Sequence, residues 1–124
     1  MKKLIAVQTK KNIEKVRKRL EGARVVVNVP GVLNGEVSGV EALQTGHRLL
    51  AESKPDVALT IANVLLEQVD DVVDVYIVKA RALLELEAIY ELHQLVEPLV
   101  TAAPNNRGVL MIAARSVSYT HLTL

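Results

Sequence analysis

The chain has to build its hydrophobic core without phenylalanine, tryptophan or cysteine. It has 124 residues, of which 50% are apolar, so the core must be assembled from valine, leucine, isoleucine and alanine. This apolar content argues against a disordered chain, and the length suits a single domain. The lack of cysteine excludes disulfide bonds, a thiolate nucleophile and zinc sites with cysteine ligands.

The N-terminal half of the sequence has short β-type runs and one basic helical segment. Leu4–Val7 and Val25–Val29 are rich in β-branched residues, and Asn12–Leu20 between them has apolar positions at helical spacing. Val57–Ile61 alternates in polarity and is predicted as a third buried strand, although Val57, Ile61 and Val64 also share one helical face. Short connections favour a right-handed crossover, which predicts a parallel sheet with the basic helix on one face.

The same half resembles the receiver domains of bacterial response regulators, both in the order of its elements and in two short motifs. Receivers often have a small-residue turn followed by the sequence EAL, and this chain has Gly39 followed by EAL at Glu41–Leu43. Receivers also often have KPD before the third strand, and this chain has KPD at Lys54–Asp56. The resemblance implies a receiver-like, flavodoxin-like α/β fold with a parallel sheet. An extended helical segment between about Val64 and Ala103 would be added to that fold.

The sequence departs from working receivers at the positions that carry their chemistry. Receivers hold magnesium with acidic residues after the first strand and accept a phosphoryl group on an aspartate at the end of the third. The matching positions here contain no carboxylate, since they are Gln8, Thr9, Thr60 and Ile61. The resemblance therefore implies a pseudo-receiver, a non-catalytic regulatory or protein-interaction module of a bacterial cytoplasmic protein. Similar domains precede MinD/ParA-like ATPases, which implies a protein partner or a C-terminal domain, an ATPase being one option.

A second resemblance is to the tetratricopeptide repeat, a pair of helices that recurs with a period of about 34 residues. Apolar residues recur at helical spacing from Val69 to Leu84 and again from about Ala88 to Thr101. Residues one such period apart are identical in several places. Leu49-Leu50 match Leu83-Leu84, Leu65 matches Leu99, Val75 matches Val109, and Ala80-Arg81 match Ala114-Arg115. This resemblance implies a helical scaffold for protein–protein interaction, but it leaves the opening strand–helix–strand pattern unexplained. The receiver-like fold is favoured, the helical repeat is the alternative, and a hybrid of the two stays open.

Charged residues are unevenly distributed and mark a candidate interaction surface. Basic residues concentrate in the N-terminal helical segment, and acidic residues gather near the middle of the chain. The predicted surface consists of Lys15, Arg17, Lys18, Arg19, Asp70, Asp71 and Asp74. No aromatic residue accompanies the basic segment to stack on nucleic-acid bases, so a protein is the expected partner and nucleic acid is not.

No pattern indicates catalysis, a metal or a cofactor. His47 and His93 lack the paired spacing of metal ligands, so no catalytic or metal site is predicted and the chain is not expected to be an enzyme. Gly31, Gly35 and Gly39 lie where a phosphate loop would sit, but their spacing is not that of a dinucleotide or P-loop motif. A fragment of an α/β nucleotide-binding enzyme is kept as a second alternative.

The two ends of the sequence give the remaining expectations. The start, MKKLIAVQTKK, has an apolar run too short for a secretion signal, and no stretch approaches the length of a membrane span, which predicts a cytoplasmic protein. The end resembles the translation of a transposon end used in preparing sequencing libraries. Residues 116–124 are therefore predicted to be a non-native tail, and residues 1–115 an incomplete receiver-like domain.

Overall fold

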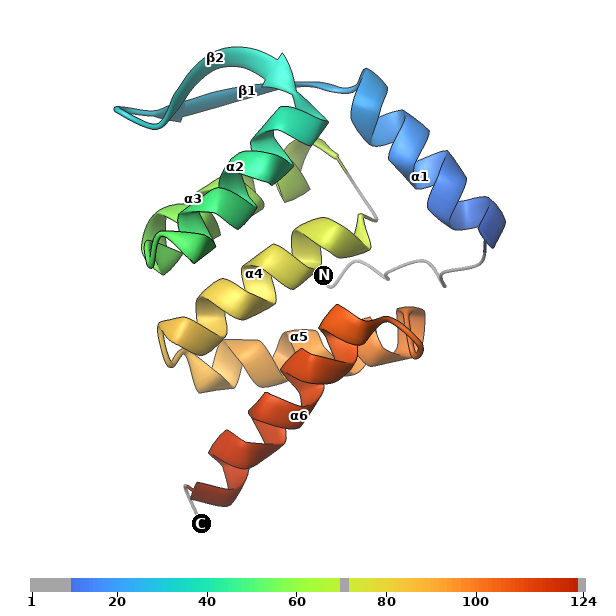
Figure 1. Ribbon diagram of the computed structural model, residues 1–124, viewed down its shortest axis with the longest axis vertical. Helices are drawn as coiled ribbons and strands as arrows, with labels where there is room; N and C mark the ends of the chain where they lie inside the picture. Colours follow the sequence, from blue (N-terminus) through green and yellow to red (C-terminus); the bar gives the residue numbers. More distant parts are fainter. Residues whose placement is uncertain (1–9, 70–71, 123–124) are drawn as a thin grey trace.

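The computed structural model describes residues 10–69 and 72–122, which form six helices and one two-stranded sheet (Figure 1). In chain order the elements are α1 (Lys10–Gly22), β1 (Arg24–Val29), β2 (Leu33–Ser38), α2 (Gly39–Ala51), α3 (Pro55–Gln68), α4 (Val73–Glu85), α5 (Ile89–Ala102) and α6 (Arg107–Leu122).

The sheet is an antiparallel hairpin. The predicted strand Val25–Val29 is confirmed as β1, but it pairs with β2, a segment for which no strand is predicted from the sequence. Val25 and Val27 are fully buried while Val26 between them is exposed, so the hairpin covers the helices with one face only. A turn containing Gly31, whose φ of 77° favours glycine, joins the two strands.

The predicted third strand is wrong. Val57–Ile61 lies inside α3, a continuous helix that begins with Pro55 at its first turn. Its buried residues, Ala58, Ile61, Ala62 and Leu65, follow helical spacing, and burying this long stripe outweighs the local β preference of a few branched residues.

The receiver-like α/β fold is therefore corrected to a mainly helical one. The described residues contain no parallel sheet, and the predicted strand Leu4–Val7 lies outside them. The predicted helix Asn12–Leu20 is confirmed within α1, but it packs against α2 and β2 rather than on a parallel sheet.

From α2 onward the structure repeats with the period present in the sequence. The pair α4 and α5 begins and ends one period after the pair α2 and α3, with all four helix bounds shifted equally, and α6 begins one period after α4. The turns inside the two pairs also match, because Ser53 and Glu87 are the only non-glycine residues with positive φ in the described chain, at 60° and 57°.

The same hydrogen bonds close both turns. The Lys54 amide donates to the Leu49 carbonyl at 2.8 Å, and the Ala88 amide donates to the Leu83 carbonyl at 2.9 Å. Each bond reaches back over the end of the first helix, as in a Schellman motif, and satisfies a carbonyl that the helix leaves unpaired. The two helix pairs are therefore copies of one structural unit.

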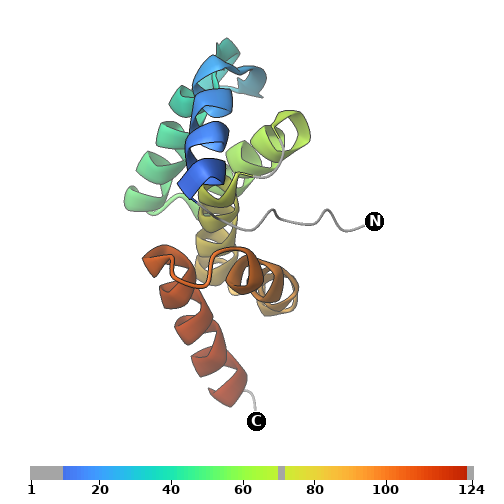
Figure 2. The ribbon, with the colours of Figure 1, turned by 90° about the vertical axis from the view of Figure 1, so that its right-hand side faces the viewer.

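Helix α4 lies at the centre of the molecule. Figure 2 shows α2 and α6 on one side of it and α3 and α5 on the other. Nine of its thirteen residues are buried. Val75 and Val78 belong to the hydrophobic cluster that includes α2, α3 and the hairpin, whereas Tyr76 and Leu83 belong to the cluster that includes α5 and α6. One helix thus connects two adjoining cores.

The hairpin is fixed to the repeats by a side-chain amide. Gln68, at the end of α3, accepts a hydrogen bond from the Val26 amide at 2.9 Å and donates one to the Val26 carbonyl at 3.0 Å. These bonds occupy backbone groups of β1 that do not pair with β2, and so they cover part of a strand edge. The hairpin therefore closes the end of the array formed by α2 and α3.

Candidate protein-interaction surface

The first helices of the successive pairs lie side by side. Helix α2 contacts α4, and α4 contacts α6 (Figure 1). His47, Arg81 and Arg115 occupy the same position in these three helices, each one repeat period from the next, and all three are exposed. We call these three residues the basic row. The repeat thereby places one basic group per helix along a common surface.

The charges around His47 shift its titration. Partial burial lowers the pKa of its imidazole below its ordinary value, the positive charge of Arg81 lowers this pKa further, and Asp74 acts to raise it. The three side chains therefore interact across the contact between α2 and α4. Because the neutral form is favoured in the free protein, an anion bound beside His47 would raise the pKa and draw a proton onto the ring.

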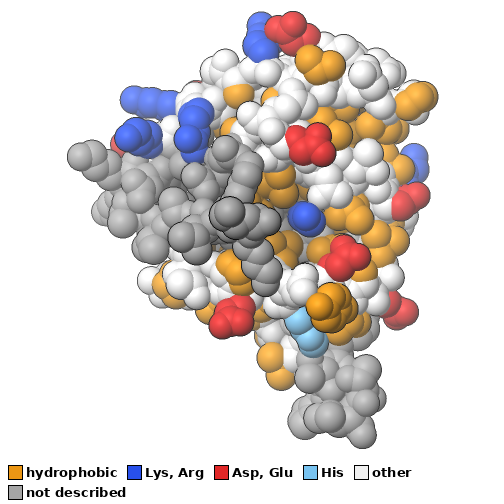
Figure 3. Space-filling model, turned by 180° about the vertical axis from the view of Figure 1, so that it is seen from behind, with side chains coloured by type: hydrophobic (Ala, Val, Ile, Leu, Met, Phe, Trp, Pro, Cys, Tyr) orange, Lys and Arg blue, Asp and Glu red, His pale blue; other side chains and the backbone are white. Residues whose placement is uncertain are grey.

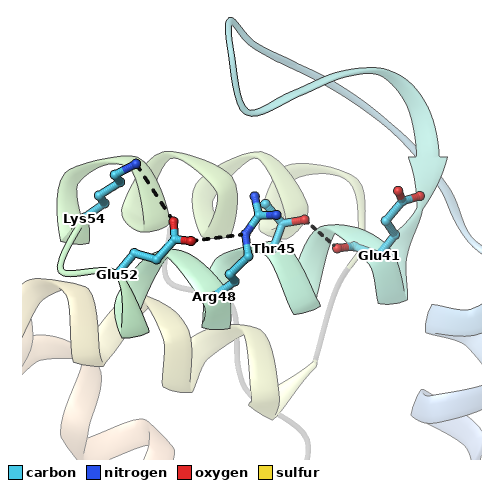
Figure 4. A network of polar contacts seen from close by, with 5 residues as sticks. All are labelled: Glu41, Thr45, Arg48, Glu52 and Lys54. Carbon is cyan, nitrogen blue, oxygen red and sulfur yellow. Dashed lines mark hydrogen bonds and ion pairs between the residues drawn. The ribbon is translucent and has the colours of Figure 1, made fainter.

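A second polar surface lies on the outer face of α2 (Figure 4). An open hollow of about 290 Å³ is lined by Glu41, Gln44, Thr45 and Arg48. Arg48 Nε lies 4.0 Å from a carboxylate oxygen of Glu52, and Lys54 Nζ lies 3.9 Å from the other. These charges offset one another in exposed positions beside the hollow, so the pairs contribute little to stability.

The predicted basic surface is present on α1. Lys15, Arg17, Lys18 and Arg19 are all exposed, and Figure 3 shows lysine and arginine side chains gathered over this helix. Asp74 is exposed in the first turn of α4, where its charge acts on His47. Asp70 and Asp71 lie outside the described residues. The candidate surface predicted from the sequence thus combined residues of different elements.

The final helix carries a group of exposed apolar side chains. Leu110, Met111 and Val117 on α6 are exposed, whereas Val109, Ile112 and Ser116 on its other side are buried. The predicted boundary between residues 115 and 116 falls inside this helix. The predicted domain end is therefore not marked by a break in the structure.

The described residues contain no group of three or more histidine, aspartate or glutamate side chains placed to hold a metal ion. Among these residues, no helix combines the length and the apolar character that crossing a bilayer requires. Comparison with family models, curated proteins and solved structures gives no match for this chain.

The sequence contains a signal for the basic row, but the prediction used only part of it. The recurrence of Ala80-Arg81 as Ala114-Arg115 indicates a period, and the sequence prediction did not extend it to a shared surface. The sequence prediction assigns no functional role to His47. When the sequences of α2, α4 and α6 are aligned at the repeat period, His47 takes the same position as Arg81 and Arg115.

Proposed function

We propose that this protein is a scaffold for protein–protein interaction built from two-helix repeats of the tetratricopeptide kind. The observation that carries the proposal is the structural repetition of the helix pair, in helix bounds and in the left-handed residues Ser53 and Glu87. Stacked helix pairs of this period create extended surfaces on which partners bind. The receiver-like module and the α/β nucleotide-binding fragment both required a parallel sheet and are not retained.

The basic row is the surface that we assign to the partner. Arg81 and Arg115 are exposed guanidinium groups, which suit a carboxylate because they can donate two parallel hydrogen bonds to it. His47 beside Arg81 can add a positive charge when an anion arrives. Asp74 at the edge of the row would repel a carboxylate placed next to it, and so would fix the register of the bound chain. We therefore propose an acidic peptide segment as the ligand.

Selection of a random peptide library on the purified protein tests this assignment. We expect enriched peptides to contain aspartate or glutamate, and Arg81→Ala to weaken their binding about tenfold through loss of a charge-assisted contact. Arg48→Ala is the matched control, since Arg48 is an exposed arginine on the outer face of α2, and this variant should bind as the parent does.

The titration of His47 gives an independent readout. A bound acidic peptide should raise the pKa of His47, and affinity should therefore increase as the pH falls from about 7.5 to about 5.5. NMR of the imidazole with and without peptide measures both effects. Enriched peptides that bind equally well to the Arg81→Ala variant and leave His47 unchanged would refute the basic row as the site.

The cytoplasm is part of the same proposal and is supported by a sequence without cysteine. The expectation of an ATPase partner loses its basis together with the receiver fold.

A further inference from the structure

The exposed face of α6 corresponds to a surface that is covered in both complete repeats. Leu110 and Val117 are 46% and 65% exposed, whereas Tyr76 and Leu83, the residues one period earlier on α4, are 9% and 1% exposed. In the first repeat the equivalent residues, Ala42 and Leu49 on α2, are 0% and 1% exposed.

In the complete repeats the second helix of the pair supplies part of the cover, and the neighbouring first helix supplies another part. Gly46 on α2, for example, lies next to Ile61 of α3 and Val78 of α4. Helix α3 packs against α2, and α5 packs against α4. The equivalent surface of α6 is exposed at Ala114, although the matching residues Gly46 and Ala80 are buried. Leu110 and Ala114 precede the predicted tail, whereas Val117 lies within it.

Charge indicates which kind of helix fits this face. Helices α3 and α5 each contain two acidic residues and no lysine or arginine. Helix α6 contains Arg107 and Arg115 and no acidic residue. Both arginines are exposed on the helix that carries the apolar side chains, so the surface complements an acidic helix with an apolar stripe.

We propose that α6 binds one acidic amphipathic helix of a partner protein, placed as α3 is on α2 and α5 is on α4. The partner helix presents branched apolar residues to Leu110, Ala114 and Val117 and carboxylates to the two arginines. This contact shares Arg115 with the peptide site on the basic row and otherwise uses different residues.

A chimera supplies such a helix at high effective concentration. It consists of residues 1–118 followed by a second copy of residues 85–106, which places the α5 sequence where a third repeat would carry its second helix. We expect the melting temperature to rise by about 5 °C, since large apolar side chains become buried. An extension with glutamate at the copied Leu92 and Leu99 positions is the matched control and should give no rise.

Leu110→Glu links the effect to the proposed face. In the parent chain this substitution should change the melting temperature little because Leu110 is exposed, and in the chimera it should abolish the rise. A rise that persists in the glutamate extension or in the Leu110→Glu chimera would overturn the proposal. Sedimentation of the parent chain should show a monomer, and a dimer that Leu110→Glu dissociates would assign the face to a second copy instead.

Discussion

Gln68 shows how one side chain can decide the placement of a whole hairpin. Its amide both accepts from and donates to the backbone of Val26, which a carboxylate or a hydrocarbon of similar size cannot do. We expect Gln68→Leu to lower the free energy of unfolding by about 1–2 kcal/mol. Urea denaturation measures this loss, and exchange of the Val26 amide should become faster.

Gln94→Leu is a suitable control for this prediction, because Gln94 is an exposed glutamine on α5. It should leave stability within about 0.5 kcal/mol of the parent. Equal effects of the two substitutions would mean that the Gln68 bonds contribute nothing beyond the general cost of a surface leucine.

At the scale of the element, the turns inside the two helix pairs store the same backbone strain. Ser53 and Glu87 adopt left-handed φ values of 60° and 57°, a region that costs side-chain-bearing residues about 1 kcal/mol or more. Glycine relieves this cost but loses more entropy on folding, so Ser53→Gly and Glu87→Gly should each stabilise the protein by about 0.5 kcal/mol.

The double variant should show nearly additive gains in melting temperature, since the two turns lie in different repeats. Ser53→Ala keeps the strain and should give no gain. Destabilisation by both glycine variants would show that the side chains of Ser53 and Glu87 support their turns.

The sequence predicted individual helices and strands better than it predicted which segments pair or pack with them. The β-branched residues of Val25–Val29 were sufficient to identify β1, but β2 contains Asn34 and Gly35 and becomes a strand only because β1 pairs with it. Val57–Ile61 fitted both a strand and a helix over its short length. Only the continuation of the stripe to Leu65 distinguishes the two, as the periodic match of Leu65 with Leu99 already indicated.

The candidate site was harder to predict because it depends on packing between helices. The exposure of Lys15 and its neighbours follows from the charge of α1 alone. The proximity of Asp74 to His47 requires knowing that α2 and α4 are adjacent, and the intervening chain, which includes all of α3, gives no local signal of that contact.

For the whole molecule, the two hydrophobic clusters joined by α4 predict stepwise loss of structure. Leu99→Ala removes a fully buried side chain from the cluster of α5 and α6 and should cost about 3 kcal/mol. Hydrogen exchange should then accelerate in α5 and α6 while α2, α3 and the hairpin stay protected.

Leu65→Ala is the matched variant, because Leu65 stands one period before Leu99 and is 1% exposed in the other cluster. It should accelerate exchange in α3 and β1 most. Uniform acceleration by either substitution would show that the two clusters unfold as one cooperative unit.

The contrast between the polar outer face of α2 and the apolar face of α6 gives the array a direction. The end next to α2 carries the hairpin and exposed polar residues that include Glu41 and Arg48, and a further helix pair would find little apolar surface there. The end at α6 offers the same kind of surface that α4 offers to α5. Duplication or loss of one repeat unit in the gene would therefore be tolerated at the α6 end, and the hairpin end would stay constant while the length of the protein changed.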